Sequence, residues 1–370
     1  MKWFQYADEQ VSERELMIAV PSMMIGVGIL SLPKDLAAVT SAADGWLVLL
    51  IGGIITMLTG YLLARVGASF PHQSFITYTS TLVTKPIAIL ITFIYTLIAI
   101  LMTAYEVREI SFTSKLYLFE HTPIEVIALS FLLVVVYAVT GSRVGLLRLN
   151  MMFLPIILFI AFLIVVLNIG LIDFGNFLPM FKTDVKGYLD GMMEGSTSYL
   201  GLSIIVFYVT LVREPRKAPK KVVVGIGIAM SLYILLFIAC ILIFGNRVTT
   251  NLIYPVIELG KEVEIPGGFF ERFESVFFVT WIMAIFNTTA MAFDIAVLSL
   301  HSIFQNVSKR TIVFCLSPLI FLISMYPNNI IELADFGMLL GRTAFFYSIF
   351  LSIVLFTIVK LKGVGKNNEI

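Results

Sequence analysis

Charged residues are scarce in this chain of 370 residues, making up 13% of it against 59% hydrophobic residues. The mean hydropathy of +0.98 leaves too little polar surface to cover a water-soluble globule of this length. The formal net charge is only +1, so nothing indicates a nucleic acid or another polyanion as a partner. The composition therefore predicts a protein whose main solvent is membrane lipid.

Cysteine and histidine are also scarce. Cys240 and Cys315 lie in apolar runs without metal-ligand spacing, so we expect packing residues and no disulfide framework. The histidines His72, His121 and His301 lie at the ends of apolar runs and form neither an HExxH motif nor a cluster. Catalytic triads, Walker loops and a GxGxxG after a strand are missing as well. We therefore expect no metal site, no cofactor and no enzymatic activity.

Long apolar runs are the main feature of the sequence. A bilayer core of about 30 Å is crossed by about 20 helical residues, and about ten runs of this kind are separated by charge, proline or glycine. The runs are continuous rather than alternating, which excludes barrel strands and predicts helices. We expect one all-α transmembrane domain over residues 1–370. Its spans are expected at about 12–38, 45–68, 84–109, 123–141, 145–170, 187–212, 220–245, 268–302, 308–326 and 332–360.

Lysine and arginine are distributed unevenly between the connections. With the N-terminus assigned to the cytoplasm, sixteen cations fall on the inner side and eight on the outer side, and Arg342 lies within the last span. The block REPRKAPKK at 213–221 is one of the inner connections. Because cytoplasmic loops carry the excess of lysine and arginine, we expect both termini in the cytoplasm.

The first apolar run contains a glycine motif, MMIGVGILSLPKDL at 23–36. Gly26 and Gly28, between Pro21 and Pro33, weaken the helix where a continuous span favours leucine or alanine. One interpretation is close helix packing on small residues. The other is an unwound stretch, whose free amides suit a carboxylate and whose free carbonyls suit a cation.

The sixth run is interrupted in a similar way, as GYLDGMMEGSTSYLG at 187–201, with a polar centre at 194–199. Interrupted helices at positions one and six are what an inverted repeat of five plus five spans gives, with a binding site between the breaks. This placement favours the broken-helix interpretation of the first run.

Polar side chains at membrane depth are the next candidates. An unpaired charge there is costly, so Asp294 and Arg342 either form a structural ion pair, which we favour because neither lies at a break, or titrate in a transport cycle. Glu106, near the outer end of the third run, faces either a vestibule or bulk solvent. Thr288 and Thr289 offer oxygens to a cation beside the first break, or bond to their own helix.

Three short motifs carry a family resemblance: GVGILSLP at 26–33, TGSRVG at 140–145 and FGNFLP at 174–179. With them, the chain resembles the integral-membrane B subunits of bacterial spore germinant receptors over essentially its whole length. The first motif also matches the Gly-x-Gly-Ile pattern of the amino acid, polyamine and organocation transporter superfamily, of which those subunits form a branch.

The resemblance implies a subunit of the spore inner membrane that works with an A subunit and a lipoprotein C subunit. Such receptors sense amino acids, sugars or nucleosides that trigger germination. By analogy with the superfamily, a ligand carboxylate meets the amides of the first break and the sixth run contacts its other end. The implied ligand-binding residues are Gly26, Val27, Gly28, Ile29, Ser196, Thr197 and Tyr199.

Three functions remain open at this point. The first is a receptor subunit that binds a small nutrient, most simply an amino acid, and passes a conformational change to its partners. The second is an amino acid permease that works by alternating access, and the third is an ion or water channel. Sensor and carrier need the same broken helices, so the sequence does not separate them.

Overall fold

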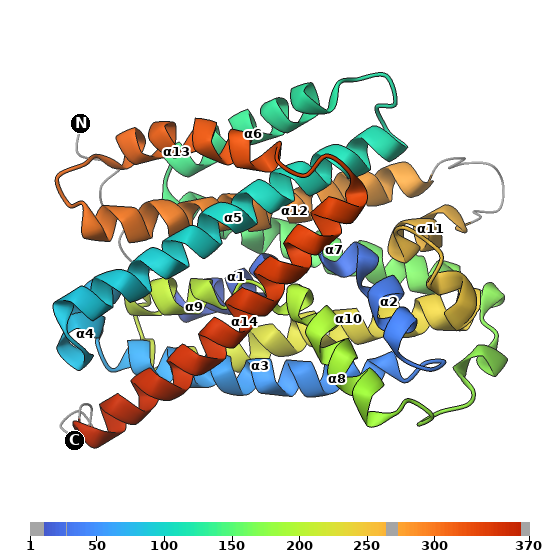
Figure 1. Ribbon diagram of the computed structural model, residues 1–370, viewed down its shortest axis with the longest axis horizontal. Helices are drawn as coiled ribbons and strands as arrows, with labels where there is room; N and C mark the ends of the chain where they lie inside the picture. Colours follow the sequence, from blue (N-terminus) through green and yellow to red (C-terminus); the bar gives the residue numbers. More distant parts are fainter. Residues whose placement is uncertain (1–10, 27, 264–272, 364–370) are drawn as a thin grey trace.

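The computed structural model describes residues 11–26, 28–263 and 273–363, and this part of the chain is built from helices (Figure 1). No strand occurs in these three segments; Val11 and Val212 form an isolated parallel bridge. The expected all-α membrane fold is confirmed. Val27 lies outside the described residues.

Fourteen α-helices are described, and short 3-10 turns continue some of them. They are α1 (Glu13–Met24), α2 (Gly28–Val39), α3 (Gly45–Ala68), α4 (Phe75–Leu82), α5 (Lys85–Tyr117), α6 (Ile124–Thr140), α7 (Arg143–Leu167), α8 (Val185–Glu194), α9 (Ser203–Tyr208), α10 (Ala218–Thr249), α11 (Pro255–Lys261), α12 (Phe273–Ile303), α13 (Lys309–Ser324) and α14 (Ile330–Leu361). The helices α4 and α11 lie in connections where no element was expected.

The expected number of ten spans stays a prediction. Within the described residues, six helices are long and apolar enough to cross a membrane, and the bent pairs at the first and sixth runs raise this to eight at most. The remaining two expected spans correspond to α6, which has 17 residues, and α13, which has 16. Both fall short of the about 20 residues that a perpendicular span needs, so length and composition alone do not establish ten spans.

Glycines let α3 and α10 pack closely. A Cβ atom at Gly60 would lie 2.6 Å from the Cδ1 atom of Ile226, and one at Gly53 would lie 2.3 Å from the sulfur of Met230. Apolar side chains gain nothing from leaving lipid for one another, so membrane helices associate through close contact of this kind. These glycines explain why α3 and α10 form one of the main helix pairs of the bundle.

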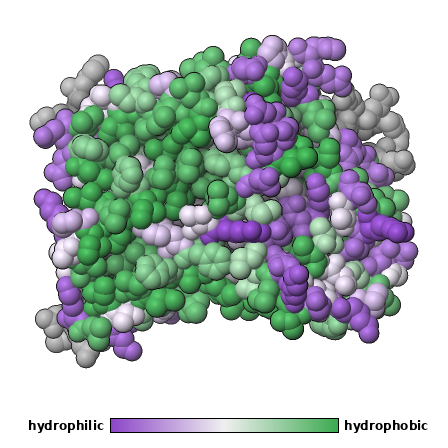
Figure 2. Space-filling view, viewed as in Figure 1, coloured by the Kyte–Doolittle hydropathy of each residue, from purple (hydrophilic) through white to green (hydrophobic). Residues whose placement is uncertain are grey.

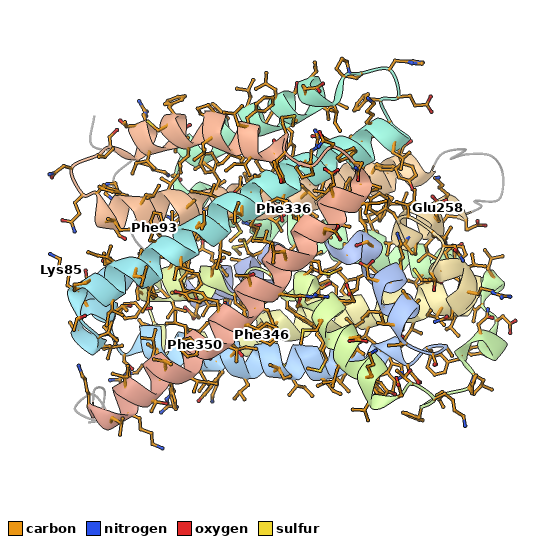
Figure 3. All side chains as sticks on the ribbon, in the orientation of Figure 1. Lys85, Phe93, Glu258, Phe336, Phe346 and Phe350 are labelled. Carbon is orange, nitrogen blue, oxygen red and sulfur yellow. The ribbon has the colours of Figure 1, made fainter. Side chains whose placement is uncertain are left out.

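Large apolar side chains cover the outside of the bundle, and Figure 2 shows a broad hydrophobic area between more polar ends. Phe93 on α5 and Phe346 and Phe350 on α14 are 54%, 48% and 64% exposed. Figure 3 shows them along two helices that cross the face of the molecule. In a soluble protein such an area would promote aggregation, whereas here it matches the hydrocarbon of a bilayer.

The two ends of the bundle are formed by different segments of the chain. At one end the backbone of Val11 pairs with Leu211 and Arg213, and the N–H of His72 donates to the carbonyl of Thr210. The basic segment 213–221 follows directly, so we name this the basic end. The helices α8 and α11 lie at the opposite end, on the right in Figure 1.

Candidate functional site

The first span is broken at the glycine motif. The helix α1 ends at Met24, α2 begins at Gly28, and their axes are bent by 55°. Ile25 has left the helical region at φ −80° and ψ 72°, and its N–H still donates to the carbonyl of Pro21. The first N–H groups of α2 have no acceptor within their own helix. This break leaves donors free inside the bundle, as the sequence predicts.

Two other helices approach the break at Gly26. A Cβ atom at Gly26 would lie 2.8 Å from Oγ1 of Thr288 on α12 and 3.1 Å from Oε1 of Glu106 on α5. Contacts below 3.0 Å force a shift of neighbouring atoms, so glycine is what allows the three helices to meet here. The hydroxyl oxygen of Thr289 lies 2.8 Å from Oε2 of Glu106 and 2.7 Å from the carbonyl oxygen of Ile285, and its one proton serves one of them at a time.

The carboxyl group of Glu106 is the chemically unusual member of this cluster. The residue is 3% exposed, and no ion pair to it occurs among the residues that the structure describes. Thr288 bonds to the carbonyl of Ile285 in its own helix. The structure therefore brings Gly26, Glu106, Thr288 and Thr289 together, in a setting able to hold a proton or a cation beside the break.

The sixth span is broken as well. The segment Val185–Tyr199, formed by α8 and the 3-10 turn η3 (Gly195–Tyr199), is bent by 43° from the segment Ser203–Leu211. Gly201 supplies the turn with a φ of +108°, which L side chains rarely adopt. Both expected breaks are thus present in the fold.

The polar side chains of this second break point in different directions. Ser196 donates to the carbonyl of Met193 and Thr197 to that of Glu194, so both hydroxyls bond within their own segment. The hydroxyl of Tyr199 donates to the carbonyl of Leu49 over 2.6 Å. Tyr199 is therefore buried against α3 and does not line the space between the breaks.

Tyr233 on α10 joins the two breaks. Its hydroxyl oxygen lies 2.6 Å from the carbonyl oxygen of Met24 and 2.8 Å from that of Ser198. Gly28 faces the same segment, since a Cβ atom there would lie 3.4 Å from the Cα of Ser198. One buried phenol thus holds the end of α1 and the turn η3 in a fixed relationship.

A cavity of about 290 Å³ opens beside this junction, toward the end that carries α8 and α11. Its lining residues are Gly28, Ser31, Lys34, Asp35, Tyr105, Glu109, Glu194, Thr197, Ile253, Tyr254, Ile330, Ile331, Ala334, Asp335 and Met338. Of the expected ligand-binding residues that the structure describes, Gly28 and Thr197 line it. Ile29 instead lines a small apolar cavity with Trp281, on the other side of α2.

Charges of both signs line the larger cavity. Lys34 contributes one ammonium group, and Asp35, Glu109, Glu194 and Asp335 contribute carboxyl groups. Glu109 accepts a hydrogen bond of 2.7 Å from the hydroxyl of Tyr254. The volume falls at the lower limit of typical ligand pockets, about 300 Å³, and suits a small solute with a positive and a negative group.

Comparisons with known proteins extend this description. A family model described as "Spore germination protein" matches residues 10–333. The chain belongs to the spore germination protein family. Its resemblance to germinant receptor B subunits is thereby confirmed at the level of the family.

Individual relatives cover nearly the whole chain. The spore germination protein GerLB of Bacillus cereus is 41% identical over 100% of this chain and 99% of GerLB. The spore germination protein YndE of Bacillus subtilis (strain 168) is 28% identical over 96% of this chain and 98% of YndE. These similarities indicate a multi-pass membrane protein of the germinant-receptor or permease type.

The fold also has a solved counterpart. The crystal structure of MhsT in complex with L-phenylalanine matches with a TM-score of 0.66 at 15% identity, covering 96% of this chain and 99% of MhsT. At this identity the likeness shows a shared fold.

The prediction that Asp294 pairs with Arg342 is wrong. Nε of Arg143 donates to Oδ2 of Asp294 over 2.6 Å and Nη2 donates to Oδ1 over 3.2 Å. The hydroxyl of Tyr208 also donates to Asp294, and Nζ of Lys309 lies 3.7 Å from Oδ1. Asp294 thus belongs to a network near the basic end, apart from the cavity.

Arg342 pairs elsewhere. Its Nη2 donates to Oε1 of Glu194 over 3.1 Å, next to the turn η3. The sequence correctly indicated that Asp294 and Arg342 are paired, but not with which residues. Each has an oppositely charged partner on a helix that is distant along the chain.

Further buried polar groups lie at the junction, and Ser198 among them belongs to the polar centre expected at 194–199. The hydroxyls of Ser22 and Ser198 and the amide nitrogen of Asn287 have no hydrogen-bond partner among the described residues. The sequence did not single out Tyr233, Asp35 and Glu109. Asp35 follows Gly28 by two helical turns and Glu109 follows Glu106 by one, so helical spacing was the available signal.

Proposed function

We propose that this chain is the ligand-binding membrane subunit of a spore germinant receptor and binds an amino acid in the cavity beside the two breaks. The observation that carries the proposal is the lining of that cavity. Gly28 begins α2 there, and Lys34, Asp35 and Glu109 supply charges of both signs. A zwitterion offers a counter-charge to both kinds of group at once, whereas a neutral sugar or nucleoside offers one to neither.

The ligand's carboxylate is placed by two donors. The unpaired N–H groups at the start of α2 carry the positive end of the helix dipole, which favours an anion at Gly28. Lys34 lies on the same side of α2, because both residues line the cavity. The ammonium group then faces Glu109 and Asp35. This arrangement keeps the contact with the first break that the superfamily analogy implies.

Signalling requires the bound state to differ from the free state. The cavity is bounded by α2, α5, η3 and α14, and a ligand that draws these elements together favours one arrangement of the bundle by its difference in affinity. In the proposed assembly, A and C subunits read this arrangement in the spore inner membrane. The basic end, with both termini, faces the cytoplasm in this proposal.

An amino acid permease is the second candidate. The observation that favours it is Glu106, a buried carboxyl group beside the first break that suits coupling to a proton or cation. The fold shared with MhsT and the two broken helices are compatible with alternating access.

Uptake and germination measured on the same chain separate the two functions. Purified chain is reconstituted into proteoliposomes and tested for uptake of each amino acid, while a strain lacking the gene is tested for germination with and without the gene restored. We expect restored germination and no accumulation above protein-free liposomes. Concentrative uptake by the isolated chain would contradict the sensor and support the permease.

A further inference from the structure

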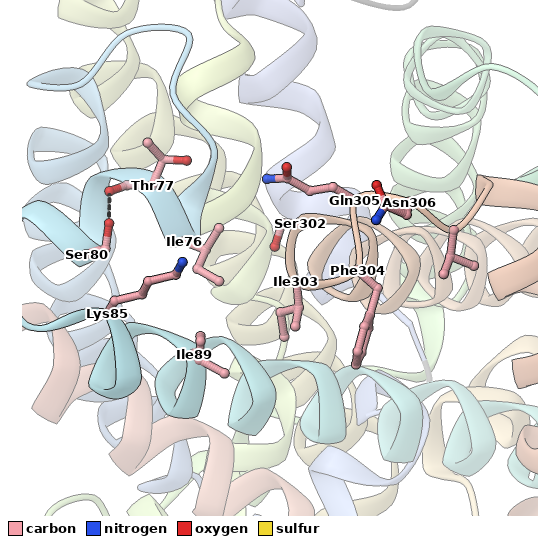
Figure 4. Close-up of a pocket in the computed structure, with 11 residues that line it drawn as sticks. Ile76, Thr77, Ser80, Lys85, Ile89, Ser302, Ile303, Phe304, Gln305 and Asn306 are labelled. Atoms are coloured by element: carbon pink, nitrogen blue, oxygen red, sulfur yellow. Dashed lines mark hydrogen bonds between the residues drawn. The ribbon is translucent and has the colours of Figure 1, made fainter.

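A second cavity lies at the basic end, between α4, the first turns of α5 and the end of α12 (Figure 4). It measures about 500 Å³. It is separate from the proposed nutrient site, since the two cavities share no lining residue. Its lining residues are Ile76, Thr77, Ser80, Lys85, Ile89, Ser302, Ile303, Phe304, Gln305, Asn306 and Val307.

Lys85 is the one charged residue in this lining. Figure 4 shows its side chain extending into the space between α4 and the end of α12. The side chains of Ser302, Gln305 and Asn306 add hydroxyl and amide donors on the opposite wall, and within the described part of the chain no aspartate or glutamate lines the cavity. Donors with a single positive charge and no carboxylate favour an anionic group.

The apolar part of the lining continues onto the outside of the bundle. Ile89 lines the cavity, and Phe93 and Leu97 follow it at intervals of one helical turn along α5. These three side chains are 36%, 54% and 47% exposed, and Phe304 on the opposite wall is 56% exposed. Figure 3 shows Lys85 at the start of α5 and Phe93 further along the same helix. The surface is therefore polar at the end of the bundle and apolar toward its middle.

We propose that this cavity binds one anionic phospholipid. The lipid phosphate lies at Lys85, and an acyl chain lies along Ile89, Phe93 and Leu97. A soluble phosphate would use only the polar half of the site, whereas a lipid matches both halves and reaches it from the bilayer. Anionic lipids are concentrated in the cytoplasmic leaflet, and basic pockets between helices bind their head groups.

Lipid retention by the purified full-length chain tests the site. The chain is reconstituted into nanodiscs of phosphatidylcholine with or without phosphatidylglycerol, re-extracted in mild detergent, and the retained lipid is quantified by mass spectrometry. We expect wild type and Lys85→Arg to retain phosphatidylglycerol selectively. Lys85→Gln should lower this selectivity about fivefold, the effect of one cation near an anionic surface, and Lys85→Glu should lower it further.

A matched control comes from the same end of the molecule. Lys220 is an exposed lysine in the basic segment and does not line the cavity. We expect Lys220→Gln to retain phosphatidylglycerol as wild type does. Equal loss in Lys220→Gln and Lys85→Gln, or undiminished retention in Lys85→Glu, would overturn the proposal. Displacement of the retained lipid by millimolar inorganic phosphate would instead assign the site to a soluble anion.

Discussion

The hydroxyl of Tyr233 lies 2.6 Å from the carbonyl oxygen of Met24, the last residue of α1. The same hydroxyl is 2.8 Å from the carbonyl of Ser198 in the second break. A phenol can donate only one proton at a time, so it alternates between the two breaks or serves one of them. Either way, α10 links the end of α1 to the turn η3, which borders the cavity.

Tyr233→Phe removes this connection without changing the ring. We expect a loss of about 1–3 kcal/mol in stability, because a buried carbonyl loses its donor, and a weaker ligand response. Tyr347→Phe is the matched control, since its hydroxyl donates to the carbonyl of Ile91 and so joins α14 to α5 rather than the two breaks. Thermal unfolding and germination dose-response curves of both variants check this. A normal response in Tyr233→Phe would show that the connection is structural only.

The Arg143–Asp294 pair joins the start of α7 to α12, and Asp294 is fully buried. Reversing one charge leaves the other uncompensated, at a cost of about 3–5 kcal/mol. We therefore expect low abundance in Arg143→Asp and in Asp294→Arg, and partial recovery in the double variant, measured by immunoblot of membranes. The same exchange between Arg342 and Asp294 should give no recovery. Recovery there would contradict the pairing found in the structure.

Asp44 anchors the connection between α7 and α8. Its carboxylate accepts N–H bonds from Phe181, Lys182 and Thr183 at 2.6, 2.8 and 2.9 Å, and the Thr183 hydroxyl at 2.8 Å. Burial raises the pKa of Asp44, but these hydrogen bonds outweigh it and hold the pKa below its ordinary value of 3.8. A carboxyl group with a lowered pKa stabilises the fold above the ordinary value, and this stability is lost as the pH falls through the lowered pKa.

The pH dependence of unfolding measures this anchor. We expect Asp44→Asn to unfold at a lower temperature than wild type at pH 6, with a difference that shrinks as the pH falls below about 4. Thermal unfolding of both proteins in detergent between pH 3 and 7 gives the comparison. A difference that is independent of pH would mean that the ionised carboxylate does not hold the connection.

Glu106 provides a test of whether the first break does more than allow close helix packing. Glu106→Gln keeps an acceptor for Thr289 but removes the group able to hold a proton or a cation, so we expect normal abundance and a shift of at least about tenfold in the half-maximal ligand concentration. Glu258→Gln is the control and should respond normally. Glu258 lies on α11, is partly exposed and is labelled in Figure 3. An unshifted dose-response curve in Glu106→Gln would assign the carboxyl group a structural role.

The sequence was sufficient for the fold class and for both breaks. Both breaks have a local cause, because glycines within an apolar run weaken one particular turn whatever surrounds it. The partners of the break have no such local cause. Thr288 and Glu106 meet Gly26 only because α5 and α12 pack against α1, and their separation along the chain carries no information about that contact.

The charged residues show the same limit. Asp294 and Arg342 were expected to be charges that need partners; Asp294 is fully buried, whereas the side chain of Arg342 is 40% exposed. Arg143, the partner of Asp294, lies at a helix start that the sequence places at a membrane surface. Ser196 and Tyr199 were expected in the pocket by analogy with the transporter superfamily. In the turn η3 the hydroxyl of Ser196 bonds to its own backbone and that of Tyr199 to α3. These orientations depend on the bend of 43° between the two halves of the sixth span.

Equilibrium binding to the purified full-length chain tests the central claim most directly. The twenty amino acids are screened first, and the best ligand is then compared with its amide and with its deaminated analogue on wild type, Gly26→Val, Gly28→Val and the control Gly170→Val, where an added side chain meets nothing within 4 Å. We predict saturable binding by wild type and Gly170→Val, at least about tenfold weaker binding of either analogue, and no binding by either break variant. Equal affinity for ligand and analogues, or undiminished binding by Gly28→Val, would contradict a zwitterion site at the break.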